Sequence, residues 1–290
     1  MDVLMMIAVL ICNQGATLAY KKFSLVSDEN QRGAPVFIAF WTGMLGLLLA
    51  AAVLITTGEY RLSPVTAVAG IIGGLCFAAA GILYVHIMAT GPFIWSVIMM
   101  NVSKFIPVLY AALALGEAIT LAQVVGVLLI MSILFVMNIG QQGDSRPFTM
   151  RWMVLATACM VINGAMFSAQ KAQSHHMAGE ELLQMLSLLF LSSAASAGIY
   201  SFLTLKRGEW PPVNTLLPPA LGLVGCVGIG NVLTMALMPR IPAAIQFPIT
   251  VGCGIVLSAV LGVLLYQERP GPRLYLSIAL LTVGAVLLGM

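Results

Sequence analysis

Long apolar segments follow one another along the whole chain and constrain its fold more than any other feature. A run of about 20 mostly apolar residues forms a helix that crosses the ~30 Å hydrocarbon core of a bilayer, because a helix rises 1.5 Å per residue and satisfies its own backbone hydrogen bonds. We predict such helices at residues 3–22, 36–57, 66–89, 92–115, 119–139, 151–173, 183–204, 216–237, 242–264 and 272–290. The predicted fold class is an all-α integral membrane protein with ten transmembrane helices.

The composition agrees with this class. Of the 290 residues, 60% are hydrophobic and 8% are charged, and the mean hydropathy is +1.03, whereas soluble domains carry about 25% charged residues. The net charge of +3 is too small to indicate a nucleic-acid partner. The five cysteines lie in apolar runs without a CxxC or Cys/His cluster, so we expect no disulfide framework, no metal site and no cofactor.

The two halves of the chain repeat each other at an offset of about 150 residues. The matching landmarks, in the same order in both halves, are Lys22 with Lys171, Gly58-Glu59-Tyr60 with Gly208-Glu209-Trp210, Gly70 and Gly73 with Gly222 and Gly225, Pro92 with Pro242, and Glu117 with Glu268. Five helices in each half is an odd number, so the second repeat is inverted relative to the first. We divide the chain into a repeat at 1–140, a connecting loop at 141–150 and a repeat at 151–290. Inverted repeats are typical of secondary transporters that bind substrate near the bilayer midplane and work by alternating access.

One segment between the fourth and fifth predicted helices resembles a known family. Gly116-Glu117-Ala118-Ile119-Thr120-Leu121-Ala122-Gln123-Val124-Val125-Gly126 is similar to the Gly-Glu-x-x-Thr-x-x-Gln-x-x-Gly run of EamA-type members of the drug/metabolite transporter (DMT) superfamily, and Gln267-Glu268-Arg269-Pro270 followed by Gly284 is a looser match. The resemblance implies export or uptake of small metabolites, with the first, third, fourth, sixth, eighth and ninth helices around a central cavity and the fifth and tenth at the periphery. Asn13-Gln14-Gly15-Ala16 departs from the aromatic pair that family members often carry in the first helix, so no member's substrate is transferred to this chain.

Lys104 is a charged residue near the middle of a predicted helix, with Asn101 three positions before it and Pro107 just after it. A charge at a helix centre costs about 2.5–3.5 kcal/mol on insertion, so it normally borders a cavity or has a partner. We expect Lys104 to bind an anionic group of the substrate or to titrate and couple transport to protons. A structural ion pair is the alternative, but no Asp or Glu lies in the middle of a predicted helix.

Other polar and aromatic residues on the predicted cavity helices complete the candidate substrate site. They are Asn13, Gln14, Tyr84, Trp95, Asn163, Asn231 and Gln246. For each polar residue the alternative is a structural hydrogen bond between helices, worth about 0.6 kcal/mol on average. For Trp95 the alternative is an anchor at the membrane interface. His86 is a second proton-coupling candidate, because imidazole titrates near neutral pH.

Charged residues near the helix ends have more ordinary expected roles. Lys22 and Lys171 are expected to extend to the lipid head groups, the alternative being a pathway that is basic at both mouths. Glu117 and Glu268 are expected at the N-termini of the helices that follow them. His175 and His176 are expected in a solvated loop beside Glu180 and Glu181, without metal-ligand spacing.

The sequence therefore predicts a secondary transporter of small organic metabolites in the cytoplasmic (inner) cell membrane, with a coupling proton or an exchanged metabolite as its further partner. The alternative is an exporter of amphipathic or aromatic compounds, in which Tyr84 and Trp95 matter more and Lys104 is structural or proton-coupling. We expect no enzyme, because HExxH, GxSxG, Walker A and an intramembrane Asp pair are absent from the sequence. The distribution of Lys and Arg favours termini outside the cell, whereas the family resemblance implies cytoplasmic termini.

Overall fold

The computed structural model describes residues 2–26, 33–90, 93–138, 149–205, 211–266 and 272–288, and within these ranges every regular element is a helix. The elements are α1 (Asp2–Val26), α2 (Ala34–Thr57), α3 (Pro64–Thr90), α4 (Phe93–Val102), η1 (Ser103–Phe105), α5 (Ile106–Ala114), α6 (Leu121–Asn138), α7 (Met150–Met177), α8 (Leu182–Thr204), α9 (Val213–Leu237), α10 (Ala243–Tyr266) and α11 (Pro272–Leu288). They coincide with the predicted helices within a few residues, except that 92–115 is divided among α4, η1 and α5. His175 and His176 are exposed as expected, but they lie in the last turn of α7 and not in a loop.

Five helices of the described residues are long and apolar enough to cross a membrane, namely α2, α3, α7, α8 and α9. Their apolar residues are distributed all round the helix, and many large ones remain exposed, such as Ile55 at 84% and Phe202 at 79%. An all-round apolar helix belongs in the core of a large protein or in a membrane. Helices of this kind in an all-helical chain point to a membrane protein.

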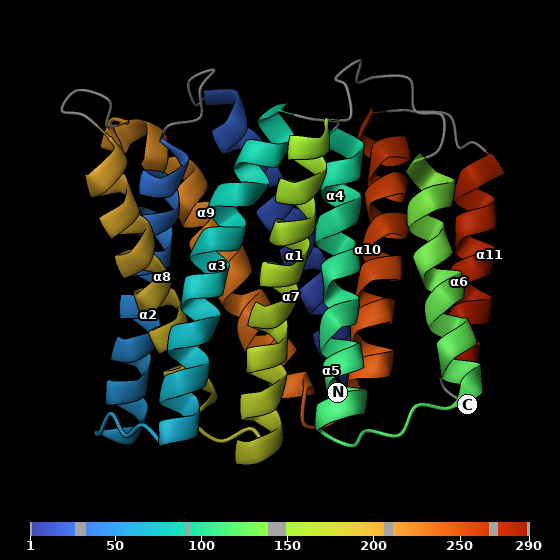
Figure 1. Cartoon of the computed structure of the whole chain (residues 1–290), viewed down its shortest axis with the longest axis horizontal. Helices are drawn as coiled ribbons and strands as arrows, with labels where there is room; N and C mark the ends of the chain where they lie inside the picture. The colour runs from blue at the N-terminus through green and yellow to red at the C-terminus, as the bar shows by residue number, and fades with distance from the viewer. Residues whose placement is uncertain are drawn as a thin grey trace.

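The helices lie side by side along one common direction (Figure 1). α2 packs on α8 at one edge of the bundle, and α6 packs on α11 at the other edge. Between these pairs, α1 packs along α9 and α3 packs along α7, while α10 contacts α6, α1 and the α4–η1–α5 segment. α1, α3, α4, α5, α7, α9 and α10 thus form the middle of the bundle.

The α2–α3, α5–α6, α7–α8 and α9–α10 connections meet at the end of the bundle drawn at the bottom of Figure 1, which we call the lower end. The first helix begins and the last helix ends there as well. Asp2 Oδ1 pairs with Arg240 Nη1 at 3.3 Å, and Gln123 Nε2 donates to the carbonyl of Leu288 at 3.5 Å. Polar contacts between connections therefore join the helices at this end.

An aromatic cluster forms the core between α2, α3 and α8. Trp41 is fully buried, and its ring centroid lies 5.7 Å from that of Phe77 and 6.0 Å from that of Phe190. Tyr20 of α1 makes edge contacts with Trp41 and Phe37 at 6.4 and 6.5 Å. This cluster fixes α1 against the α2–α8 pair through Tyr20.

The Gly116–Gly126 motif has a structural explanation for each of its polar and small residues. Gly116 ends α5 in the left-handed conformation with φ +69°, which glycine adopts without strain. Thr120 and Gln123 form a reciprocal capping box at the start of α6, with bonds of 3.1 and 3.2 Å. Gly126 lets α6 approach α11, because a Cβ there would lie 2.8 Å from the carbonyl oxygen of Gly284.

Candidate functional site

The helix that carries Lys104 is interrupted at that residue. α4 ends at Val102, η1 covers Ser103–Phe105, and α5 begins at Ile106. Pro107 has no N–H to donate to the carbonyl one turn earlier, so the regular hydrogen-bond ladder is broken here. The N–H of Ile106 bonds instead to the carbonyl of Ser103, three residues back. Lys104 therefore stands at an irregular turn halfway along an otherwise helical segment.

Helix α7 holds this interruption in place. The amide Nδ2 of Asn163, which is 7% exposed, donates to the hydroxyl of Ser103 at 2.6 Å. That hydroxyl in turn donates to the carbonyl of Met100 at 2.6 Å. The neighbouring Gly164 allows close approach, because a Cβ there would lie 2.6 Å from the Cβ of Ile106. Two of the predicted cavity helices are thus in tight contact around the break.

Lys104 has no ion pair or hydrogen bond with any part of the chain that the structure describes. Protein surrounds its side chain, which is half-buried, and η1 packs against α7 and α10. Asn101, also half-buried, lies one turn earlier in α4 and makes an interaction of its own. A surrounded ammonium that keeps accessible surface and has no internal counter-charge is a suitable binding partner for an anionic group.

Tyr84 lies in α3 beside this region. It is half-buried and packs against the cluster formed by Ala80, Ile87 and Cys159. Tyr20 of α1 lies close enough to Tyr84 for electrostatic interaction between the two hydroxyls. Tyr20 was not among the predicted site residues, although it follows Asn13 by two helical turns and so lies on the same face of the helix.

Three predicted residues connect the helices of the second half with their neighbours. Gln14 Nε2 of α1 donates to the carbonyl of Gly254 in α10 at 3.0 Å. Gln246 of α10, 2% exposed, donates to the carbonyl of Thr234 in α9 at 2.9 Å. Asn231 of α9 accepts from Gln170 of α7 at 3.4 Å. These amides therefore join α1 to α10, α10 to α9, and α9 to α7.

The remaining predicted residues are placed as follows. Asn13 is half-buried in α1, and His86 is exposed on α3. Trp95 belongs to α4, but its side chain lies outside the described residues, as does that of Lys22. Glu268 is also outside the described ranges. The structure brings Lys104, Asn101 and Asn163 together, and it groups Asn231 and Gln246 separately.

Lys171 and Glu117 form an ion pair at the lower end, which corrects two expectations. Lys171 Nζ lies 2.6 Å from Glu117 Oε1, with side-chain exposures of 4% and 22%, and also donates to the carbonyl of Met238 at 3.0 Å. Lys171 is therefore buried and does not extend to lipid head groups. Glu117 Oε2 accepts from the N–H of Ala243 at 3.0 Å, so it caps α10 and not the helix that follows it. Glu117, Lys171 and Ala243 lie far apart along the chain, and their spacing carries no information about their distance in the folded protein, so this contact was not predicted.

A second carboxylate, that of Glu181, joins the α7–α8 connection to the start of α3 at the lower end. Glu181 accepts hydrogen bonds from the N–H and the hydroxyl of Ser63 at 3.0 and 2.8 Å. Burial tends to raise the pKa of Glu181, but hydrogen bonds from Thr66 and Ser63 outweigh it and lower the pKa below its ordinary value. Glu181, in the α7–α8 turn, thus caps α3 in the same way that Glu117 caps α10.

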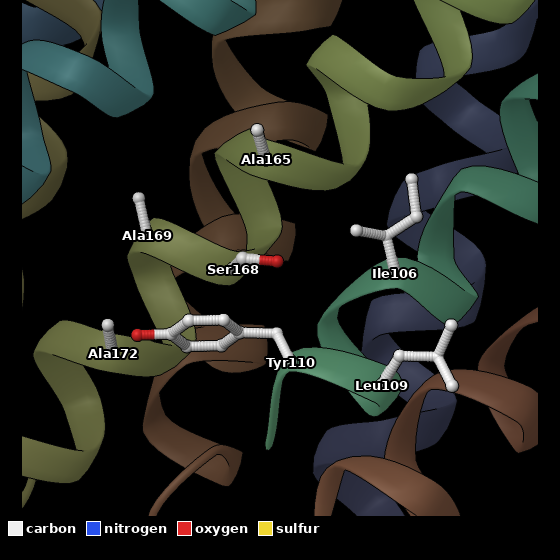
Figure 2. A pocket seen from close by; sticks show the side chains of 7 residues that line it. All are labelled: Ile106, Leu109, Tyr110, Ala165, Ser168, Ala169 and Ala172. Atoms are coloured by element: carbon white, nitrogen blue, oxygen red, sulfur yellow. The ribbon is translucent and has the colours of Figure 1, made fainter. Parts of the chain in front are cut away.

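A hollow of about 510 Å³ lies between α5 and α7 (Figure 2). The ring of Tyr110 crosses it toward Ala172, and Ser168 supplies its other polar side-chain group. A second hollow, of about 500 Å³ between α3 and α7, shares Ala169 and Ala172 with the first. The small alanines of α7 leave this space, and no predicted site residue lines either hollow.

No protein-family model matches this chain, and no curated protein does. Twenty-nine chains of solved structures match. One of them, described only as the crystal structure of a protein, is 22% identical and has a TM-score of 0.76, covering 99% of this chain and 95% of its own. The whole chain therefore shares its fold with a protein of known structure, and at this identity the likeness concerns the fold alone.

Proposed function

We propose that this chain is a secondary transporter of small organic metabolites that works by alternating access and binds an anionic group of its substrate at Lys104. The observation that carries the proposal is the half-buried ammonium of Lys104, which has no partner in the described part of the chain and stands at a helix break halfway along its span. Leaving such a charge without a partner in a membrane costs about 2.5–3.5 kcal/mol. A ligand that supplies the missing negative charge offsets that cost, so a binding role explains why the lysine is tolerated.

The proposed architecture is ten membrane-crossing helices in two inverted repeats, at 1–140 and 151–290, of the EamA type within the drug/metabolite transporter superfamily. The helix contacts support it. In the two repeats α1 corresponds to α7, α2 to α8, α3 to α9 and α6 to α11. The α1–α9 contact therefore corresponds to the α7–α3 contact, while the α2–α8 and α6–α11 contacts each join two corresponding helices. The chain would then lie in the cytoplasmic (inner) cell membrane with its substrate between the repeats.

The driving force in this proposal is an ion gradient or exchange of metabolites, because the sequence has no Walker A loop to bind ATP. The irregular turn at Ser103–Phe105 gives α4 and α5 a point at which to bend, and the contact with Asn163 links that bend to the second repeat. The polar contacts at the lower end are the ones that must separate for that end to open.

A second candidate function is export of amphipathic or aromatic compounds. The observation that favours it is the proximity of two tyrosines, Tyr20 of α1 and Tyr84 of α3, together with the mostly apolar hollow beside Tyr110. In that case aromatic surfaces bind the substrate and Lys104 has a structural or proton-coupling role.

The deciding experiment compares wild-type protein with Lys104→Met in detergent, using the melting temperature across a panel of carboxylates, phosphates, amines and aromatic compounds. Compounds that stabilise the wild type are then tested for uptake into vesicles. Arg151→Met is the matched control, since it removes an exposed cation from the first turn of α7.

Anionic compounds are expected to stabilise the wild type and Arg151→Met but not Lys104→Met, and uptake should follow the same order. Equal stabilisation of all three proteins by anions would overturn the proposal. Stabilisation of all three by aromatic compounds, lost in Trp95→Ala or Tyr84→Ala, would establish the second candidate instead.

A further inference from the structure

The lower end contains a buried basic site that a carboxylate of the same chain occupies. The ammonium of Lys171 contacts Glu117 at 2.6 Å, and the other oxygen of that carboxylate accepts from the N–H of Ala243, the first residue of α10. The hydroxyl of Ser174, one turn after Lys171, is 1% exposed and has no partner among the described residues. The ammonium and the helix N-terminus already hold one carboxylate between them, and this pair of groups is a suitable oxyanion-binding site.

Two buried amide oxygens near this pair, on Gln170 and Gln246, have no hydrogen-bond donor among the described residues. Asn231 Nδ2 donates to the carbonyl of Val227, which orients Asn231 so that its oxygen accepts from Gln170. Within the described part of the chain, Gln170 Oε1 therefore has no donor, and Gln246 Oε1 has none either, because the Gln246 amide nitrogen bonds to the carbonyl of Thr234. Each unpaired buried acceptor costs about 1–3 kcal/mol.

If these groups remained buried in every state of the protein, the free-energy cost of the unpaired acceptors and of desolvating the ion pair would be present in every state. If the lower end opens to water in another state, water hydrates these groups and the cost is absent in that state. The buried polar groups at the lower end thus bring the closed and open arrangements closer in free energy, as a two-state element requires.

We propose that Lys171 and the N-terminus of α10 form a second anion-binding site, which Glu117 fills in this state and which a carboxylate or phosphate of the transported molecule takes over when the lower end opens. The source of that anion rests on the proposed function. When another oxyanion replaces the Glu117 carboxylate, the ammonium of Lys171 still has a negative partner. The α5–α6 connection, which carries Glu117, is then no longer bonded to the start of α10. Lys104 and Lys171 would then bind the same anionic group in succession along the pathway.

The test is chemical rescue of Glu117→Ala by acetate, followed as the melting temperature of the purified full chain in detergent, with chloride at equal ionic strength as reference. Acetate is expected to raise the melting temperature of Glu117→Ala along a saturating curve, because it binds the folded site. Wild type, the double variant Glu117→Ala/Lys171→Met, and Glu59→Ala, which loses an exposed ion pair with Arg61, should show no such rise. No rise in Glu117→Ala, or an equal rise in the double variant, would overturn the proposal.

Glu117→Gln provides a second measurement that preserves shape. With the negative charge removed, Lys171 should be acylated by an N-hydroxysuccinimide ester faster than in the wild type, and inorganic phosphate should slow the reaction, as read by mass spectrometry. Unchanged labelling, or labelling that phosphate does not slow, counts against the site. Repeating the rescue in a Lys104→Met background separates the two proposals, since acetate should still act there even if Lys104 binds no substrate.

Discussion

Asn163 of α7 donates a 2.6 Å hydrogen bond to the hydroxyl of Ser103, and so one half of the chain holds the helix break in the other half. The bond places Lys104 at a fixed position relative to α7. Because the amide is 7% exposed, it has little access to another acceptor if the hydroxyl is removed. The contact therefore contributes both to stability and to the geometry of the proposed site.

Ser103→Ala should lower the free energy of unfolding by about 1–3 kcal/mol, since it leaves a buried amide donor unpaired. Ser168→Ala is the control, because the Ser168 hydroxyl bonds only to the carbonyl of Gly164 in its own helix and should cost less. Unfolding in detergent by heat or denaturant measures both. Equal stability of the two variants would contradict the assigned role of Ser103.

Breaking the Glu117–Lys171 pair should be strongly destabilising. Lys171→Met or Glu117→Gln is expected to cost toward the lower end of about 3–5 kcal/mol, given that Glu117 retains 22% exposure. The double variant should cost less than the sum of the two single changes, because no charge is then left without its partner. Glu59→Gln, which breaks the exposed pair with Arg61, should change stability by about 0–1 kcal/mol. Additive effects in the double-mutant cycle would show that the pair is not coupled.

Gly164→Ala should destabilise the protein by about 1–3 kcal/mol through overpacking. The new Cβ would lie 2.6 Å from the Cβ of Ile106, which is bonded to the backbone and has no freedom to move aside. Gly225→Ala in α9 is the matched control, since nothing lies within 4 Å of its Cβ; it should be neutral or stabilising by up to about 1 kcal/mol through helix propensity. A melting temperature for Gly164→Ala equal to that of Gly225→Ala would refute the close contact between α7 and α5.

The stability contributed by Glu181 should depend on pH. Hydrogen bonds from Thr66 and Ser63 lower the pKa of this carboxyl in the folded protein despite partial burial. A lowered pKa stabilises the folded state above the ordinary value of about 4.3 and loses that effect as the pH falls through the folded-state pKa. Glu181→Gln should therefore be less stable than wild type at pH 7, and the difference should shrink below about pH 4.

Glu180→Gln serves as the control for Glu181, because the Glu180 side chain is exposed at the adjacent position. It should match the wild type across the whole pH range. Melting curves recorded from pH 7 down to pH 3 provide the comparison. A difference between Glu181→Gln and wild type that grows on acidification would have the wrong sign and would exclude this account.

The helices and their approximate ends were predictable from the sequence, because length, apolar content and the Gly and Pro residues between segments act locally. The capping box of Thr120 and Gln123, which was not predicted from the sequence, has an equally local cause, since its partners are three residues apart. The helix break at Lys104 also has a local cause, because Pro107 lies three residues after it. In each case the physical cause lies within one turn of chain.

Tertiary packing sets which distant groups meet. Glu117 was expected to serve the helix that follows it, but packing places it against Lys171 and the start of α10, while Lys104 has no charged partner in the described part of the chain. The sequence determined that both lysines would lie on apolar helices at a cost in solvation. Whether a carboxylate reaches them depends on how α5, α7 and α10 pack, because an ion pair forms only at contact distance and that distance is set by the whole bundle.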